Sequence, residues 1–108
     1  MTVLSDLAAL VPDARDRLKG VARITPVELN QRLTEDTGSE VWLKREDLQP
    51  VRSYKLRGAY NLISQLPPEA RDAGVVCASA GNHGQGVAFA AATLGIGAVG
   101  YVPTTTPR

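Results

Sequence analysis

The stretch GVVCASAGNHGQGVAFAAATLGIGAVGYV, residues 74–102, decides the fold. It opens with a continuous apolar run at 75–78, which is typical of a strand buried on both faces. A glycine-bearing turn at 79–84 follows, and then an alanine-rich helix over 87–94. A second apolar strand covers 96–102. Strand, turn, helix and strand within about 30 residues predict a βαβ unit with parallel strands and a right-handed connection.

Upstream of this unit, apolar spacing predicts a helix over 5–18, a strand over 40–45 and a helix over 54–66. A further helix is expected to begin at Thr25 and to end near Thr37. Its start, Thr25-Pro26-Val27-Glu28, has the form of a capping box with proline at the first helical position. The residues that form the buried stripe of the 54–66 helix are expected to be Leu56, Ala59, Tyr60, Ile63 and Leu66.

The composition is that of an ordinary soluble globular protein, with 44% apolar and 21% charged residues in 108. Twelve Lys and Arg against 11 Asp and Glu leave a net charge of +1, which argues against a nucleic-acid or polybasic membrane partner. No run approaches the roughly 20 apolar residues that span a bilayer. The N-terminus has no secretory leader, so a cytoplasmic setting is expected. Because the sequence stops in a Thr/Pro loop, residues 1–108 are expected to be a fragment.

Several kinds of site are excluded or disfavoured. One cysteine, Cys77, and one histidine, His83, cannot form a disulfide or a zinc site by themselves. The glycines match neither the dinucleotide fingerprint nor the Walker A motif. A Cys/His catalyst is disfavoured, because Cys77 lies in an apolar strand that keeps a thiol protonated. The charged residues at 44–47 are expected to be solvated or mutually paired at the edge of the sheet.

Lys55 lies in the first turn of a predicted helix, at the positive end of the helix dipole. Arg52 and Arg57 add like charge, and all these effects lower a lysine pKa. A neutral lysine amine is a nucleophile for aldehydes and forms Schiff bases. The alternative is an ordinary solvated lysine, which is the commoner situation.

The turn Ser79-Ala80-Gly81-Asn82-His83-Gly84 lies at the carboxyl end of a predicted parallel strand, where α/β sheets bind ligands. Open backbone N–H groups and a nearby helix start suit a carboxylate or a phosphate. Asn82 can both donate to and accept from a ligand oxygen. The alternative is a plain strand–helix connection.

These two segments carry a resemblance. LKREDLQPVRSYKLRGAY, residues 43–60, resembles the cofactor-lysine segment of threonine dehydratases, and SAGNHGQGVA, residues 79–88, resembles their asparagine loop. The resemblance implies an α/β, three-layer, mostly parallel sheet with flanking helices. It would be the N-terminal portion of a fold type II pyridoxal-phosphate (PLP) enzyme, in the tryptophan-synthase-β-like group.

The resemblance also implies residue roles. Lys55 matches the lysine that holds pyridoxal 5′-phosphate as a Schiff base and moves the substrate's α-proton. Asn82 matches the asparagine that bonds the 3′ oxygen of the cofactor and lies at the substrate. Ser79, Gly81 and His83 match the loop that receives the substrate carboxylate. Serine racemases, which are close relatives, carry a serine where this chain has Ala80, so dehydration is favoured over racemisation.

The implied activity is dehydration and deamination of L-threonine to 2-oxobutanoate and ammonia, as in isoleucine biosynthesis. The alternatives are a serine dehydratase, a β-replacement enzyme such as cysteine synthase, or a non-catalytic anion-binding α/β module. The family also implies a homo-oligomer, a dimer or a tetramer. The glycine-rich cofactor-phosphate loop of the family is absent from residues 1–108. The chain alone is therefore expected to bind cofactor weakly and to leave threonine unconverted.

Overall fold

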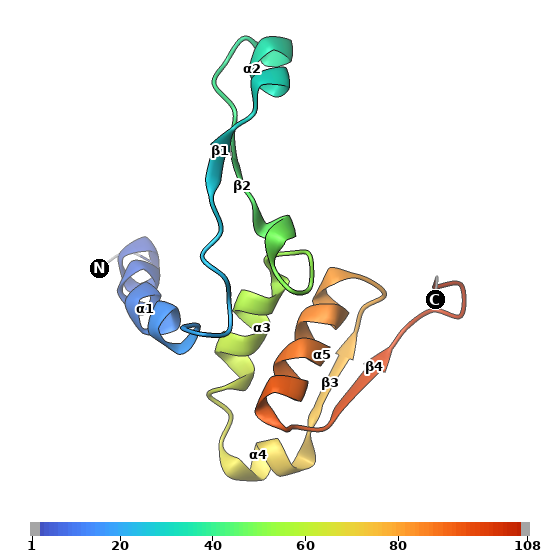
Figure 1. The fold of residues 1–108 in the computed structure, drawn as a ribbon. Helices are drawn as coiled ribbons and strands as arrows, with labels where there is room; N and C mark the ends of the chain where they lie inside the picture. Colours follow the sequence, from blue (N-terminus) through green and yellow to red (C-terminus); the bar gives the residue numbers. More distant parts are fainter. Residues whose placement is uncertain (1–2, 107–108) are drawn as a thin grey trace.

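The structure is a computed structural model that describes residues 3–106. Within them the chain forms helices and short strands in the order shown in Figure 1. The elements are α1 (Val3–Arg17), β1 (Val27–Leu29), α2 (Gln31–Thr37), β2 (Trp42–Lys44), the 3₁₀ helix η1 (Glu46–Leu48), α3 (Lys55–Ile63), α4 (Pro68–Ala73), β3 (Val75–Ala78), α5 (Asn82–Leu94) and β4 (Ala98–Tyr101).

The predicted βαβ unit is present. Strands β3 and β4 pair in parallel, with Val75 opposite Ala98 and Ala78 opposite Tyr101, and α5 connects them. The helix starts at Asn82, five residues before the predicted 87, so its first two turns include part of the glycine-rich segment. The prediction of a strand buried on both faces is wrong for the described residues. Alternate residues of β3 are half-buried, whereas Val76 is 69% exposed.

The core lies between α3, α5 and the sheet, and α3 and α5 run side by side in Figure 1. Small side chains let the two helix backbones approach closely. Leu56 is fully buried at the start of α3, and Tyr60 and Leu66 from the predicted stripe are only partly buried. The buried apolar residues of the core cluster are Ala59, Ile63, Val87, Ala90, Ala91 and Ile96.

The capping box predicted at Thr25 is wrong. Residues Val27–Leu29 form β1, which pairs antiparallel with β2, and the helix begins only after Asn30. The Asn30 side chain caps it by accepting from the Leu33 N–H at 2.9 Å. Glu28, the expected acid of the box, instead forms an ion pair with Arg45 at 2.7 Å. Residues Val27–Leu29 thus pair with a strand that begins 15 residues after Val27 in the sequence, and this pairing overrides the local helix signal.

The remaining helices agree with the predictions in part. Helix α1 spans Val3–Arg17 and keeps Pro12 inside it, close to the predicted 5–18. It projects from the body in Figure 1. At its end, Arg17 Nε donates to Asn61 Oδ1 at 2.8 Å. Helix α4 is not among the elements that the sequence predicts. Pro68 is the first residue of α4, a position that suits proline. Among residues 3–106, no helix is both long enough and apolar enough to cross a membrane.

Candidate active site

Lys55 is the first residue of α3, so it lies in the first turn of its helix as predicted, although the helix begins one residue later than the predicted 54. Its backbone N–H donates to Oγ of the buried Ser53 at 3.4 Å. The ammonium group lies 5.2 Å from the centre of the Tyr54 ring, a cation–π contact at a half-buried position. Just before it, Arg52 has φ of +58°, a left-handed conformation that costs a non-glycine residue about 1–2 kcal/mol. The turn that leads into Lys55 is therefore held by its surroundings.

The Asn82 loop follows β3 at its carboxyl end. Ser79 Oγ accepts from the Gly81 N–H at 3.3 Å, which leaves the hydroxyl proton of Ser79 free to donate. No side chain caps α5, so its first N–H groups have no acceptor within the helix. Asn82 and His83 are exposed, and within residues 3–106 their side chains have no hydrogen-bond partner. The loop thus offers several unused donors at a helix start, an arrangement that suits an anion.

Gly86 brings the two segments together. A Cβ at this position would lie 2.9 Å from the carbonyl carbon of Lys55 and 3.0 Å from its oxygen. Only a glycine therefore lets α5 pack directly on the backbone at the start of α3. Gly86 is one helical turn after Asn82, so this contact fixes the Asn82 end of α5 near the Lys55 peptide. A Cβ at Gly84 would similarly lie 2.7 Å from the Ser79 carbonyl oxygen.

The predicted site residues line two neighbouring surface cavities. Lys55 and His83 share a cavity of about 330 Å³, and Ser79 and Gly81 line another of about 320 Å³ against β3 and β4. Asn82 lines neither, although it lies between Gly81 and His83 in the chain. The described residues therefore bring the five predicted residues into one region but not into one cavity. The first cavity is completed by Tyr54, Arg57, Gly58, Ala59 and Leu62.

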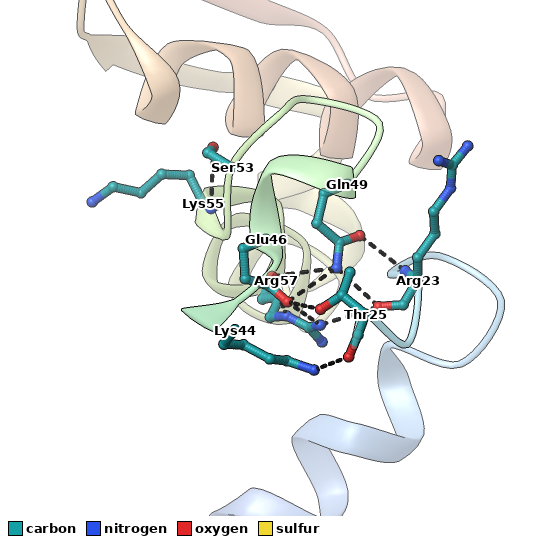
Figure 2. A network of polar contacts seen from close by, with 8 residues as sticks. All are labelled: Arg23, Thr25, Lys44, Glu46, Gln49, Ser53, Lys55 and Arg57. Carbon is teal, nitrogen blue, oxygen red and sulfur yellow. Dashed lines mark hydrogen bonds and ion pairs between the residues drawn. The ribbon is translucent and has the colours of Figure 1, made fainter. Parts of the chain in front are cut away.

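A partly buried polar network lies beside this region, and we call it the Glu46 network. Its centre is the Glu46 carboxylate, which receives Nε and Nη2 of Arg57, both at 2.8 Å, and the Thr25 hydroxyl at 2.6 Å. Gln49, which is only 1% exposed, also donates to Glu46 and links the network to a further segment. Its amide pairs with both backbone groups of Arg23, accepting from N–H at 2.9 Å and donating to C=O at 2.8 Å (Figure 2).

This network corrects the prediction for residues 44–47. Arg45 pairs with Asp47, as expected, and also with Glu28 outside the run. Glu46, however, is neither solvated nor paired within 44–47. Its ion-pair partner Arg57 and its donor Thr25 lie 11 and 21 residues away, and Gln49 lies three residues away, outside that run. Sequence reasoning missed it for that reason. The one available signal was Gln49, an uncharged amide just before Pro50 that the resemblance motif contained.

The Glu46 network makes stability depend on pH. The Arg57 guanidinium, helped by Thr25 and Gln49 and opposed by burial, lowers the pKa of Glu46 from 4.5 to about 2. A depressed pKa contributes stability above the ordinary value of 4.5, and this stability is lost as pH falls toward about 2. After discounting for solvent screening, we expect Glu46→Gln to cost about 1–2 kcal/mol at neutral pH. Urea unfolding should show this difference shrinking on acidification. A stability difference between Glu46→Gln and the parent that stays constant with pH would contradict a stabilising role of the ionised Glu46.

Comparisons with known proteins match most of the chain, and both segments lie within the match. A family model described as pyridoxal-phosphate dependent enzyme matches residues 18–108. The chain is 56% identical over 98 residues to the L-threonine dehydratase biosynthetic IlvA of Mycobacterium leprae. The match covers 91% of this chain and 23% of that protein. It is 54% identical over 101 residues to the protein of the same name from Corynebacterium glutamicum, with 94% and 23% covered. The chain thus spans about a quarter of the length of these curated relatives.

Solved structures agree in fold. The processed form of threonine deaminase isoform 2 from Solanum lycopersicum superimposes with a TM-score of 0.81 at 45% identity, over 95% of this chain and 30% of that one. Maize serine racemase superimposes with a TM-score of 0.84 at 33% identity, over 93% and 30%. The α/β fold class expected from the sequence is therefore confirmed, with β3 and β4 parallel and β1 and β2 an added antiparallel pair.

Proposed function

The chain belongs to the pyridoxal-phosphate dependent enzyme family, and from this premise we propose that it supplies the cofactor lysine of an L-threonine dehydratase. The reaction would convert L-threonine to 2-oxobutanoate and ammonia. The identity of more than half to two dehydratases supports this choice of substrate. The observation that carries the proposal is the Gly86 contact, because it places the Asn82 end of α5 against the peptide of Lys55.

The residues present fit pyridoxal phosphate. Lys55 provides a primary amine at the wall of a cavity, and Asn82 provides an amide with no partner among residues 3–106. A Cβ at Gly84 or Gly86 would clash with the backbone of Ser79 or Lys55, so these glycines hold the Asn82 segment close to Lys55. Lys55 would hold the cofactor covalently through Nζ, and Asn82 would donate to its 3′ oxygen. When bound, pyridoxal phosphate supplies an electron sink for negative charge developing at the substrate's α-carbon.

The chain's own residues would bind the substrate and move its proton. Ser79 can donate its free hydroxyl proton to the substrate carboxylate, and the N–H groups at the start of α5, next to Gly81, can donate beside it. His83 lines the cavity that holds Lys55, so it can contact the same ligand. The Lys55 amine would take the proton from the substrate's α-carbon. The Ala80 side chain carries no exchangeable proton, so Ala80 itself cannot return a proton from the opposite face.

The wider setting follows from the relatives. We propose that these 108 residues form the N-terminal portion of a longer catalytic domain, since they span 23% of the dehydratases that they resemble. The protein would act in the cytoplasm on a small amino acid and assemble as a homo-oligomer, a dimer or a tetramer. The exposed apolar side chains of β3 and β4, Val76, Val99 and Tyr101, are consistent with further chain covering this sheet.

The test is reductive labelling followed by product analysis. The full-length protein is incubated with pyridoxal phosphate, reduced with borohydride and digested, and the labelled peptide is identified. We expect the label on Lys55, and we expect Lys55→Ala to lose both the label and 2-oxobutanoate release. Threonine, serine and O-acetylserine are supplied in parallel, so that a serine dehydratase or a β-replacement enzyme would be recognised by its product.

Two results would overturn the proposal. An unlabelled Lys55 in protein that binds pyridoxal phosphate would favour the non-catalytic anion-binding alternative. Release of pyruvate from serine with no 2-oxobutanoate from threonine would move the assignment to a serine dehydratase. Residues 1–108 alone serve as a further sample, for which we expect weak cofactor binding and no release of 2-oxobutanoate.

A further inference from the structure

We propose that Glu46 is a positioning residue for Lys55, acting through Arg57 and the segment that leads into α3. The inference rests on the proposed function, because it concerns the lysine that would hold the cofactor. It goes further in assigning a role to a carboxylate that no comparison singles out. Glu46 would set the direction in which Lys55 leaves the first turn of α3, and not the chemistry of the amine itself.

The first step is that Glu46 joins three separate parts of the chain. Thr25 comes from the segment before β1, Gln49 from just after η1, and Arg57 from the first turn of α3. Arg57 holds the carboxylate with two nitrogens and also donates to the Arg23 carbonyl at 3.1 Å. A bidentate guanidinium–carboxylate pair fixes orientation as well as distance. The start of α3 is therefore tied in a defined rotation to the segments packed beside it.

The second step is that Lys55 lies between two anchored residues. Gln49, six residues before it, is fully buried, and Arg57, two residues after it, is held by Glu46. Between them the backbone passes through the left-handed Arg52 and the buried Ser53, which accepts from the Lys55 N–H. A strained turn persists only where its surroundings determine it. Loss of the Glu46 anchor would release both the turn and the first residue of the helix.

The third step is that Glu46 does not reach the amine. Figure 2 shows the Lys55 side chain extending away from the Glu46 network, on the opposite side of the helix start. Instead, the network and Gly86 act on the same short piece of backbone, since Gly86 packs on the Lys55 carbonyl. Glu46 therefore belongs with the groups that orient the lysine, and a misplacement of about 1 Å can cost up to about 100-fold in rate.

The experiment measures how fast pyridoxal phosphate becomes fixed on Lys55 in the full-length apoprotein. Samples are quenched with borohydride at intervals, well below the unfolding temperature, and the Lys55 peptide is quantified. We expect Glu46→Gln to slow labelling about 10-fold. Glu46→Asp, which keeps the charge, should recover most of the rate. The matched control is Glu28→Gln, which removes another acid of the same region and leaves the Lys55 turn intact. It should label within about twofold of the parent.

Steady-state kinetics supply the second readout. Misplacement of the lysine should lower kcat more than it raises KM for threonine, whereas loss of folded protein would lower kcat alone in proportion to the unfolded fraction. Should Glu46→Gln fail to fold, Arg57→Lys replaces it, because it keeps the charge and loses the bidentate geometry. It should slow labelling about threefold or more.

The outcomes separate this inference from the proposed function. A parent that carries no label on Lys55 overturns the proposed function and this inference together. If the parent is labelled on Lys55, and Glu46→Gln or its replacement Arg57→Lys is labelled at the same rate, only the positioning role is overturned. Slow labelling in both Glu46→Gln and Glu28→Gln would also overturn it, since the effect would then follow charge removal in general.

Discussion

Replacement of Gly86 by alanine is expected to destabilise the protein by about 3 kcal/mol and to separate the two site segments. The new methyl group would lie 2.9 Å from the Lys55 carbonyl carbon, 3.0 Å from its oxygen and 3.2 Å from the Leu56 nitrogen. All three are backbone atoms of the first turn of α3, so no side-chain rotation relieves the contact. Either α5 or the start of α3 must move, and Leu56 beside them is fully buried.

Gly58→Ala is the matched control for this prediction. Gly58 also lies in the α3–α5 region, but a Cβ there would meet nothing within 4 Å. Alanine is the better helix former, so this variant should be stabilised by about 0.5–1 kcal/mol. Urea unfolding of the full-length protein measures both changes, and the rate of Lys55 labelling should fall for Gly86→Ala. Equal stabilities for the two variants would show that α5 does not pack on the Lys55 peptide.

Elements stabilised by near neighbours were predictable from the sequence. The strand at 75–78, the helix over 54–66 and the parallel pairing follow from local apolar periodicity and from short connections. The capping box at Thr25 failed because its alternative is not local. Residues Val27–Leu29 gain a strand partner at Trp42–Lys44, and Thr25 gains a carboxylate at Glu46. Neither gain is visible in the ten residues around Thr25.

The same division applies to the candidate site. Lys55 and the Asn82 loop were found because each stands out within its own segment, one as a base at a helix start and the other as a glycine turn after a strand. What brings them together is a missing side chain at Gly86, and a glycine inside a glycine-rich run gives no special signal. The Glu46 network was missed for a related reason, because a charge run is normally solvated and burial depends on the tertiary fold.

Gln49→Glu is expected to be the most damaging of the substitutions considered, at about 3–5 kcal/mol near neutral pH. The change keeps the shape of a side chain that is 1% exposed, but it removes the Nε2 donor to the Arg23 carbonyl. It also places a second carboxylate where Nε2 now lies 3.2 Å and 3.4 Å from the two oxygens of Glu46. Arg57 already serves Glu46, so the added charge has no counter-ion of its own.

The pH dependence of the stability deficit shows whether the introduced charge causes the effect of Gln49→Glu. Burial and the neighbouring Glu46 both disfavour the charged form of the introduced carboxyl, so its pKa rises on folding. A raised pKa destabilises above its folded value and less so below it, because the protonated acid can again donate to the Arg23 carbonyl. The deficit relative to the parent, measured by urea unfolding, should therefore shrink on mild acidification. Gln65→Glu, at an exposed position, should stay within about 0.5 kcal/mol of the parent throughout. A Gln49→Glu deficit that does not change with pH would show that the introduced charge does not cause it.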